Sequence, residues 1–329
     1  MSEAKLKGLN TPYDSAFKSI IQKCPRLALF LINEMFYQNR LIPEKYDGTE
    51  HVTLLNRELT DLEFGNLEED IRLKVGTGDR SVFHMECEST AGGTRIMLRM
   101  VRYDTRTAME DAEVTDDCIR LRIDDSGVFF LRSTRSTPSM VKVILEGPQG
   151  SSMSYSIPAL KLQDYSMNEM LEKKLFIMLP FLFFNYEKQL GNAADPNDYG
   201  TIEEVYGVII QHLRDMTEQN IISAYEADTL FEALKIVVEA LGERHNAEKE
   251  VQAIMGGNVL EFRADQYYIA GKKEGREEGR EAGKTEGINQ IASLMSKLFS
   301  LGRAKDAEKA ANDPAYLQQL LAEFGMAKA

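Results

Sequence analysis

Residues Asp70 to Ser89 read DIRLKVGTGDRSVFHMECES, and this stretch decides the fold that the sequence predicts. Charged and apolar residues alternate in Asp70–Val75 and again in Ser81–Glu88, the period of two that is typical of strands with one buried face. Between them lies GTGD, whose glycines supply the positive φ that a tight turn needs. The stretch therefore predicts a β-hairpin.

The alternation collects polar side chains on one face of each predicted strand. That face carries Asp70, Arg72 and Lys74 on the first strand, and His84, Glu86 and Glu88 on the second. Carboxylates held together repel each other unless a cation intervenes. Arg72 and Lys74 would pair with the glutamates on a solvated face, or Mg²⁺ would bind the carboxylates together with water and a phosphate. His84 would be a hydrogen-bonded structural residue or, alternatively, a metal or acid–base group.

The segments around the hairpin predict a mixed α/β core. Helical spacing runs through TPYDSAFKSIIQKCPRLALFLINEMF with an interruption at Pro25, and Glu50–Leu59 fits a strand. Arg95–Asp111 predicts a helix, with apolar residues along one side and arginines along another. The apolar side holds Ile96, Met100 and Tyr103, and the basic side holds Arg95, Arg99, Arg102 and Arg106. Four β-rich segments follow: CIRLRI, GVFFLR, MVKVILEG and MSYSIPALKL.

From Ser166 onward the pattern is almost wholly helical. MNEMLEKKLFIML, EEVYGVIIQHLRDM and SAYEADTLFEALKIVVEALGERH each predict one helix. LFIMLPFLFF predicts a buried helix, because it is too short to span a bilayer and contains Pro180. GKKEGREEGREAGKTEG has a glycine every four residues, each costing a helix about 1 kcal/mol, and predicts a solvated linker or else an oligomerisation helix. The final SLMSKLFSLG and AYLQQLLAEFG are amphipathic.

Charge and cysteine content exclude several classes of protein. A net charge of −13 argues against a protein that coats nucleic acid, but it allows a local basic groove or a metal site. Cys24, Cys87 and Cys118 form no zinc or CxxC pattern and predict reduced thiols in a cytoplasm. The polar start MSEAKLKGLN cannot be a signal-peptide core, and no phosphate-binding GxGxxG or Walker pattern opens a helix. We expect a cytoplasmic protein without a membrane partner.

The order of these features resembles the PD-(D/E)xK nuclease fold: a carboxylate on one strand, a turn, an acid–x–polar pattern on the next strand, and then a basic helix. More narrowly, the chain resembles the PD-(D/E)xK nuclease family transposases, a group of recombination-promoting nucleases. The resemblance is carried by YDSAFK, similar to the family's D-x-x-F-K, by DIRLKV, by HMECES, aligned with E-x-Q-S, and by IMLRMVRYD, aligned with R-x-x-R-Y. It covers roughly residues 10 to 190, where YSIPALKLQDYSMNEM and KKLFIMLPF resemble the stretch that closes the core.

This resemblance implies an α/β fold with a restriction-endonuclease-like core, a mixed sheet flanked by helices, followed by an all-helical C-terminal region. Residues 1–190 would form the nuclease-like domain and 191–260 a helical region. Residues 261–329 would form the charged glycine-repeat segment and the C-terminal amphipathic helices. The implied cofactor is Mg²⁺, or Mn²⁺, and the implied partner is DNA. The helical C-terminal region also predicts a homo-oligomer.

The resemblance implies a catalytic set of Asp70, Glu86 and Glu88. Asp70 and Glu86 would be metal ligands, and the backbone carbonyl of Cys87 would be a third. Position 88 departs from the family, since the superfamily has lysine there and this group has glutamine. Glu88 would therefore bind a second ion, act as a base toward the attacking water, or mark a degraded site.

Other residues would supply positive charge or a further ligand. Arg72, Lys74 or Arg99 would replace the missing lysine. Asp14 stands where this group places an acid near the ion, or else it pairs with Lys18. The residues expected to contact phosphates are Lys74, Arg99, Arg102 and Tyr103. Alternatively, the arginines pair with the acids of MEDAEVTDD.

The function predicted from these residues is that of a Mg²⁺-dependent DNA endonuclease, which hydrolyses phosphodiester bonds and in this family promotes recombination. The alternative is a catalytically degraded protein of the same fold that serves as a DNA- or protein-binding module in an assembly.

Overall fold

The computed structural model describes most of the chain, in two compact units, Met1–Ala264 and Asp265–Ala329. The described residues are 11–38, 45–55, 58–61, 65–68, 71–76, 82–90, 94–192, 200–255, 291–298 and 300–324. Among these residues, no helix combines the length and the apolar character needed to cross a membrane.

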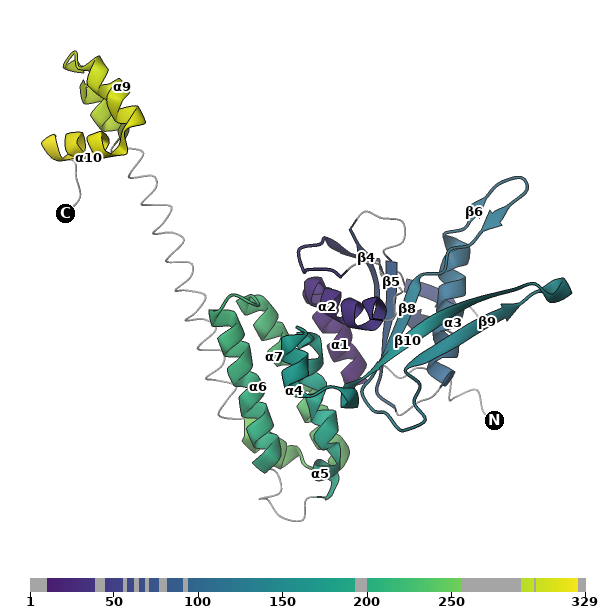
Figure 1. The fold of residues 1–329 in the computed structure, drawn as a ribbon. Coiled ribbons are helices and arrows are strands. Elements are labelled where there is room, and N and C mark those ends of the chain that lie inside the picture. The colour runs from purple at the N-terminus through teal and green to yellow at the C-terminus, as the bar shows by residue number, and fades with distance from the viewer. Residues whose placement is uncertain are drawn as a thin grey trace. The chain divides into compact units, whose positions relative to one another are not determined.

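A six-stranded mixed sheet forms the centre of the first unit (Figure 1). Its strand order is β1 (Val52–Leu54), β4 (Ile71–Val75), β5 (Val82–Glu88), β8 (Asp125–Phe130), β10 (Ser152–Lys161) and β9 (Met140–Glu146). β8 runs parallel to both β5 and β10, and the other neighbours in the sheet are antiparallel. β2 (Glu58–Asp61) pairs with β3 (Gly65–Glu68), and β6 (Glu113–Val114) pairs with β7 (Ile119–Arg120). The predicted class, a mixed sheet with flanking helices, is confirmed.

The hairpin predicted for Asp70–Ser89 is confirmed where it is described. β4 and β5 are antiparallel, with Leu73 opposite Phe83, and Gly76 begins the turn with a φ of +66°. Two other strand predictions were wrong. Glu50–Leu59 contributes to two strands of different sheets, β1 and β2, because β1 pairs with β4 whereas β2 pairs with β3. CIRLRI forms a strand only at Ile119–Arg120, since this exposed two-stranded tip has no buried face that would extend it.

Helices from the start of the chain cover one face of the sheet. α1 (Pro12–Lys23) begins after Thr11, whose hydroxyl accepts a hydrogen bond from the backbone of Asp14, and it ends before Pro25 as predicted. η2 (Pro25–Leu27), α2 (Ala28–Ile32) and η3 (Asn33–Tyr37) follow, and most of their side chains are buried. η3 approaches β8 so closely that a Cβ on Gly127 would lie 2.0 Å from Met35 Sδ. A larger residue at position 127 would therefore force this core to move.

Among the described residues, the long helix α3 (Thr94–Glu110) covers the other face of the sheet, and it lies in the connection from β5 to the parallel strand β8. Its buried residues Ile96, Met97 and Met100 pack against Val128 and Phe130 of β8 and against Ile157 and Ala159 of β10. The predicted apolar side of this helix is thus confirmed, with Tyr103 also buried.

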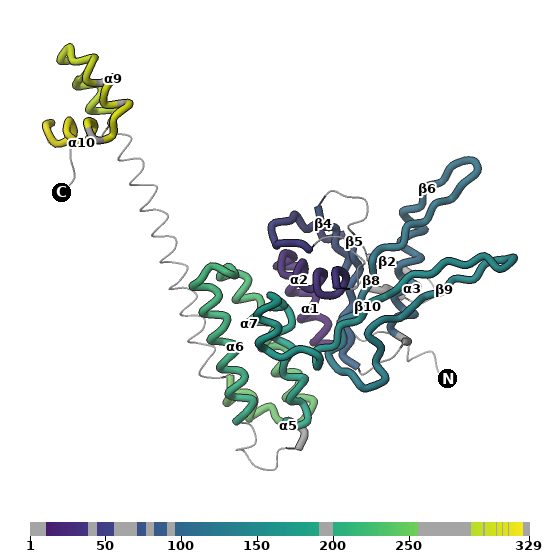
Figure 2. Tube along the Cα trace, viewed as in Figure 1, coloured from purple at the N-terminus to yellow at the C-terminus, as the bar shows by residue number. Residues whose placement is uncertain are grey.

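The helical region that follows the sheet shares the core of the first face. Its elements are η5 (Leu162–Asp164), α4 (Met167–Glu172), η6 (Phe176–Tyr186), α5 (Glu187–Asn192), α6 (Gly200–Glu218) and α7 (Ala224–His245), and residues 248–255 are also helical. α7 packs against α1 and η6, and buried residues of α6 and α7 belong to one cluster with those of α1 and β5. Figure 2 traces this path from the sheet into the helices.

The single helix predicted for MNEMLEKKLFIML is wrong. α4 ends at Glu172, and Lys174 has a φ of +58°, which no continuous α-helix allows. The next segment, η6, consists of 3-10 turns in which every residue from Phe176 to Phe184 is buried, Pro180 included. The ring of a proline clashes with the carbonyl four residues earlier in an α-helix, so Pro180 disfavours a continuous α-helix here. The prediction that LFIMLPFLFF is buried is confirmed.

The second unit is a small helical cluster. Residues 291–298 are helical, and α9 (Ala304–Asn312) and α10 (Pro314–Glu323) follow. Leu294 and Leu298 pack with Ala310, Leu320 and Leu321, so the two amphipathic segments predicted at the end of the sequence pack on each other. The glycine-repeat segment, residues 271–287, lies outside the described residues.

Candidate functional site

The middle of the polar face of the β4–β5 hairpin, formed by Arg72, His84 and Glu86, is buried rather than solvated. Arg72 lies opposite His84 in the ladder, and Glu86 lies beside Val128 of β8, which packs under α3. Glu86 is 1% exposed. The expectation of a solvated face was therefore wrong, because α3 covers it, and charges taken out of water in this way require close partners.

The partner of Glu86 is Arg99 of α3. The Arg99 Nε lies 3.0 Å from Glu86 Oε1 and its Nη2 lies 2.6 Å from Oε2, a two-pronged contact that holds the carboxylate in one orientation. Arg99 is 38% exposed in its side chain, so the pair connects a fully buried acid to the surface of the helix. The sequence offered Arg99 as one of three cations for this site, and its contact with Glu86 replaces the alternative pairing with the acids of MEDAEVTDD.

Among the described residues, the acids seen to pair with Arg72 are Asp124 and Asp111, and not the glutamates of one alternative predicted from the sequence. Its Nε lies 2.6 Å from Asp124 Oδ2 and its Nη2 lies 3.1 Å from Asp111 Oδ2. Burial raises the pKa of Asp124 above its ordinary value, and Arg72 opposes that rise. Lys74, the other predicted cation, is half-buried on the same strand. No ion pair between it and the glutamates is seen among the described residues.

His84 contacts an acid of α3, Asp104, which the sequence pattern did not mark as a site residue. Its Nδ1 lies 2.8 Å from Asp104 Oδ1, and the ring packs edge-on against Tyr103. Tyr103 is buried in this position, so a contact with DNA phosphate would require it to move. Asp104 directly follows the residues aligned with R-x-x-R-Y. It lies one helical turn after Met100, and this spacing was the sequence evidence that its side chain faces the sheet.

The remaining predicted ligands lie at the ends of β5 and α1. Glu88 ends β5 and is half-buried, and its Oε1 accepts hydrogen bonds from the backbone N–H and the hydroxyl of Thr90, at 2.8 and 2.7 Å. The Cys87 side chain points to the opposite face, into the core. Asp14 pairs with Lys18 at 3.1 Å, one of the two arrangements predicted. Asp70 lies outside the described residues.

A cation expected on the helix surface has an acidic neighbour. Arg106 lies 3.4 Å from Glu110, one of the acids of MEDAEVTDD. Arg102 is exposed and interacts with other groups, so its contact with phosphate stays a prediction. Among the described residues, which do not include Asp70, no group of three or more His, Cys, Asp and Glu side chains is arranged to hold a metal ion.

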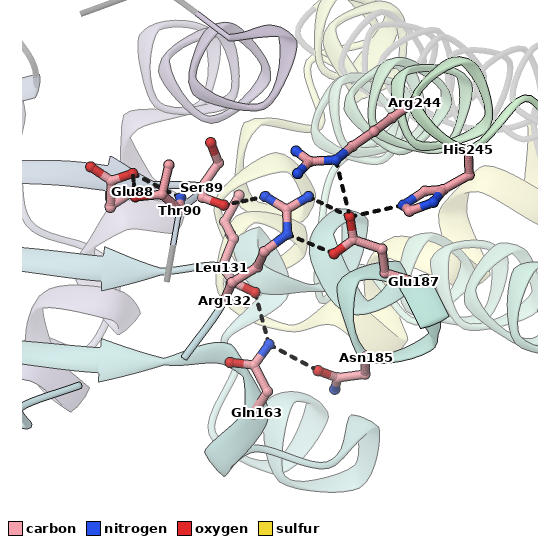
Figure 3. Close-up of polar contacts among 10 residues, drawn as sticks. All are labelled: Glu88, Ser89, Thr90, Leu131, Arg132, Gln163, Asn185, Glu187, Arg244 and His245. Atoms are coloured by element: carbon pink, nitrogen blue, oxygen red, sulfur yellow. Dashed lines mark hydrogen bonds and ion pairs between the residues drawn. The ribbon is translucent and has the colours of Figure 1, made fainter. Parts of the chain in front are cut away.

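A second charged cluster lies where β5 and β8 end, and sequence reasoning missed it (Figure 3). Arg132 follows β8 and donates through Nη1 to the carbonyl of Ser89, just after β5. Its Nε and Nη2 each lie 2.6 Å from an oxygen of Glu187, the first residue of α5. His245 Nε2 and Arg244 Nε approach the same carboxylate at 3.0 and 3.5 Å. We call Arg132, Glu187, Arg244 and His245 the Arg132 cluster.

Aromatic rings close the Arg132 cluster. The Arg132 guanidinium lies 4.5 Å from the Phe184 ring centroid and 5.8 Å from that of Tyr13. Burial raises the pKa of the Tyr13 hydroxyl. The available sequence signal was an arginine directly after the buried run VFFL and a glutamate directly after the aromatic run that ends at Tyr186. The cluster joins the sheet to the helical region.

The charge of Glu187 should make the protein sensitive to acid. Burial opposes its ionisation, but hydrogen bonds from Arg132 and His245 outweigh burial and hold the pKa below the ordinary value of 4.5. When the pKa of a carboxyl is lower in the folded protein than in the unfolded chain, the fold is stabilised at any pH above the unfolded-state pKa. This stabilisation is lost as the pH falls through the folded-state pKa. We expect the Tm difference between wild type and Glu187→Gln to be full at neutral pH and to shrink below pH 4.5. Calorimetry across pH measures it, and a pH-independent difference would contradict the assignment.

Comparison with known proteins identifies no family, because no protein-family model, no curated protein and no solved structure matches the chain.

Proposed function

We propose that the first unit is a restriction-endonuclease-like domain that hydrolyses DNA phosphodiester bonds with Mg²⁺ at the β4–β5 hairpin. The observation that carries the proposal is the hairpin register. Ile71 lies opposite Met85 and Arg72 opposite His84, so the face of β5 that carries His84 and Glu86 pairs with the polar face of β4. Asp70, which precedes β4 in the sequence and lies outside the described residues, is proposed as the second carboxylate.

The chemistry of the available donors suits a hard divalent cation. Mg²⁺ takes oxygen ligands, and those proposed are the carboxylates of Asp70 and Glu86 and the carbonyl of Cys87, with Asp14 as a further candidate. Glu86 already binds Arg99, but each carboxylate oxygen has two lone-pair sites, so one ligand does not exclude another. A divalent ion held there would supply the positive charge that phosphodiester hydrolysis requires.

The neighbouring cations have separate roles in this proposal. Arg99 offsets the charge of the buried Glu86 and fixes its orientation, so that the carboxylate is ready to bind. Arg102, exposed on the same helix, contacts the DNA backbone, and half-buried Lys74 reaches toward the phosphate from β4. Glu88, where the family has glutamine, acts as a base or a further ligand only if it releases Thr90.

The second candidate function is DNA or protein binding without catalysis. The observation that favours it is that Glu86 and Glu88 each have protein partners of good geometry, Arg99 and Thr90. Such contacts would persist in a protein of this fold that has lost its ion. This candidate predicts retention of DNA in a gel-shift assay without cleavage.

Plasmid nicking separates the two candidates. Under the first, the full chain converts supercoiled plasmid to open circles with Mg²⁺ or Mn²⁺ and stops when a chelator is added, and Asp70→Asn abolishes conversion. Cleavage that survives Asp70→Asn would contradict the proposed site, and binding without cleavage by the wild type would favour the second candidate. Glu88→Gln and Glu88→Lys add a sharper test: a gain in cleavage identifies Glu88 as an inhibiting substitution, and a loss identifies it as a working group.

A further inference from the structure

β9 is one of the two edge strands of the six-stranded sheet, and among the described residues no strand pairs with its outward edge. Among the described residues, the strand neighbour of β9 is β10 alone, and β10 contacts β8 only from Ala159 onward. The outer half of the β9–β10 hairpin is therefore a two-stranded ribbon that projects beyond the sheet in Figure 1. Ile144 is 55% exposed and Met153 51%. Strand edges of this kind bind further strands unless something blocks them.

Backbone hydrogen bonds identify which residues of β9 face outward. The Ala159 N–H donates to the Ser139 carbonyl at 2.9 Å, and the Gly147 N–H donates to the Ser151 carbonyl at 2.7 Å. Because hydrogen-bonding direction alternates along an antiparallel strand, the odd-numbered residues of β9 face β10. The backbone groups of the even-numbered residues therefore point to the free edge: Met140, Lys142, Ile144 and Glu146.

Charge complementarity points to a second copy of this chain as the occupant. In an antiparallel pair centred on Ile144, even residues meet even residues, as the outward backbone groups require. Lys142 then lies opposite Glu146 of the second copy, and Glu146 lies opposite its Lys142. A register centred on Lys142 instead would set two lysines against each other. A lysine on a strand edge usually prevents pairing with another strand. The register centred on Ile144 neutralises the charge of Lys142 with Glu146 of the second copy.

The outward edge of β10, on the other side of the ribbon, offers no such charge complementarity. The outward residues on the β10 side are Ser152, Ser154 and Ser156, which carry no charge to select a register. On the β9 edge, the apolar side chains of Ile144 from both copies would meet at the centre, and Val143 of each copy would meet Leu145 of the other on the second face. We propose that the chain forms a two-fold dimer by edge-to-edge pairing of β9, giving one continuous sheet across both copies.

The test is the dimer dissociation constant of the full chain, measured by sedimentation velocity over a range of concentrations. Wild type should dimerise. Lys142→Glu and Glu146→Lys should each weaken the dimer about tenfold, because both ion pairs become like-charge pairs. A mixture of these two variants should form heterodimers of near wild-type affinity, and the double variant should form homodimers, since both restore opposite charges.

Ile144→Pro provides a backbone test. The Ile144 N–H faces outward, so proline removes a donor from the proposed interface without removing a β9–β10 bond, and it should abolish dimerisation. Circular dichroism and thermal melting of each variant establish that it is folded. A monomeric wild type at every concentration would overturn the proposal. So would a dimer that all these variants leave unchanged, which would point to the C-terminal helices instead.

Discussion

Glu86→Gln is expected to reduce Mg²⁺-dependent plasmid cleavage by about 10³-fold or more, because the charge that holds the proposed ion is lost. Glutamine has nearly the same shape and can still accept a hydrogen bond from Arg99, which lies 2.6 Å from the carboxylate. The variant should therefore fold, at a cost of about 1–3 kcal/mol for the weakened buried pair. The measurements are the rate of plasmid nicking and Mg²⁺ binding by calorimetry, and both should decrease together.

The chain offers a matched control for this substitution. Glu226 is also buried and also accepts two hydrogen bonds from one arginine, Arg26, at 3.0 and 2.7 Å, but it lies on α7. Glu226→Gln should cost a similar amount of stability and leave nicking unchanged. If both variants lose activity equally, the loss in Glu86→Gln reflects stability and not the proposed site. If Glu86→Gln cleaves like wild type, Glu86 binds no essential ion.

Arg132→Met is expected to lower the free energy of unfolding by about 3 kcal/mol or more, a large part of the stability of an ordinary domain. The substitution removes both contacts with Glu187 and the bond to the Ser89 carbonyl. Glu187, which is 15% exposed, would keep Arg244 and His245 as neighbours, and these limit the cost. Urea denaturation monitored by circular dichroism gives the value.

The exposed ion pair of Arg122 provides a control for the effect of burial on the Arg132–Glu187 pair. Its Nη2 lies 2.9 Å from Glu113, a distance like that of the Arg132 pair, but both side chains are more than half exposed. Arg122→Met should therefore change stability by only about 0.5 kcal/mol, because water already screens the pair. The double variant Arg132→Met with Glu187→Met should regain part of the loss, since it leaves no buried charge unpaired. A cost below about 1 kcal/mol for Arg132→Met would show that the cluster contributes little.

The hairpin could be predicted from sequence because its signals are local. Alternation in Ile71–Val75 and Val82–Glu88 assigned each side chain to a face, and Gly76 marked the turn. The covering of that face could not be predicted, since a period of two does not say whether solvent or a helix lies beyond the polar side. The partners of the polar residues were hidden for the same reason: Arg72 and Asp124 are 52 residues apart in sequence.

The helix break at Lys174 illustrates a different limit. MNEMLEKK has good local helix propensity, so its pattern favours a helix that continues into the apolar run. Instead the chain turns at Lys174, and the run from Phe176 to Phe184 is buried in 3-10 turns that contain Pro180. The contacts of η6 with α1 and α7 are distant in sequence, so a local pattern does not contain them.

The packing of α1 on α7 has a consequence for synthesis of the chain. Arg26, just after α1, and Glu226, in α7, bond across 200 residues of sequence. At about 5–20 residues per second, a ribosome would need about 10–40 s to translate the stretch between them. During that interval the part of the core that α7 supplies to α1 is missing, although Phe17 also contacts Phe129 and Phe181, which are made earlier. Contacts this distant in sequence slow folding and prolong the exposure of apolar surface.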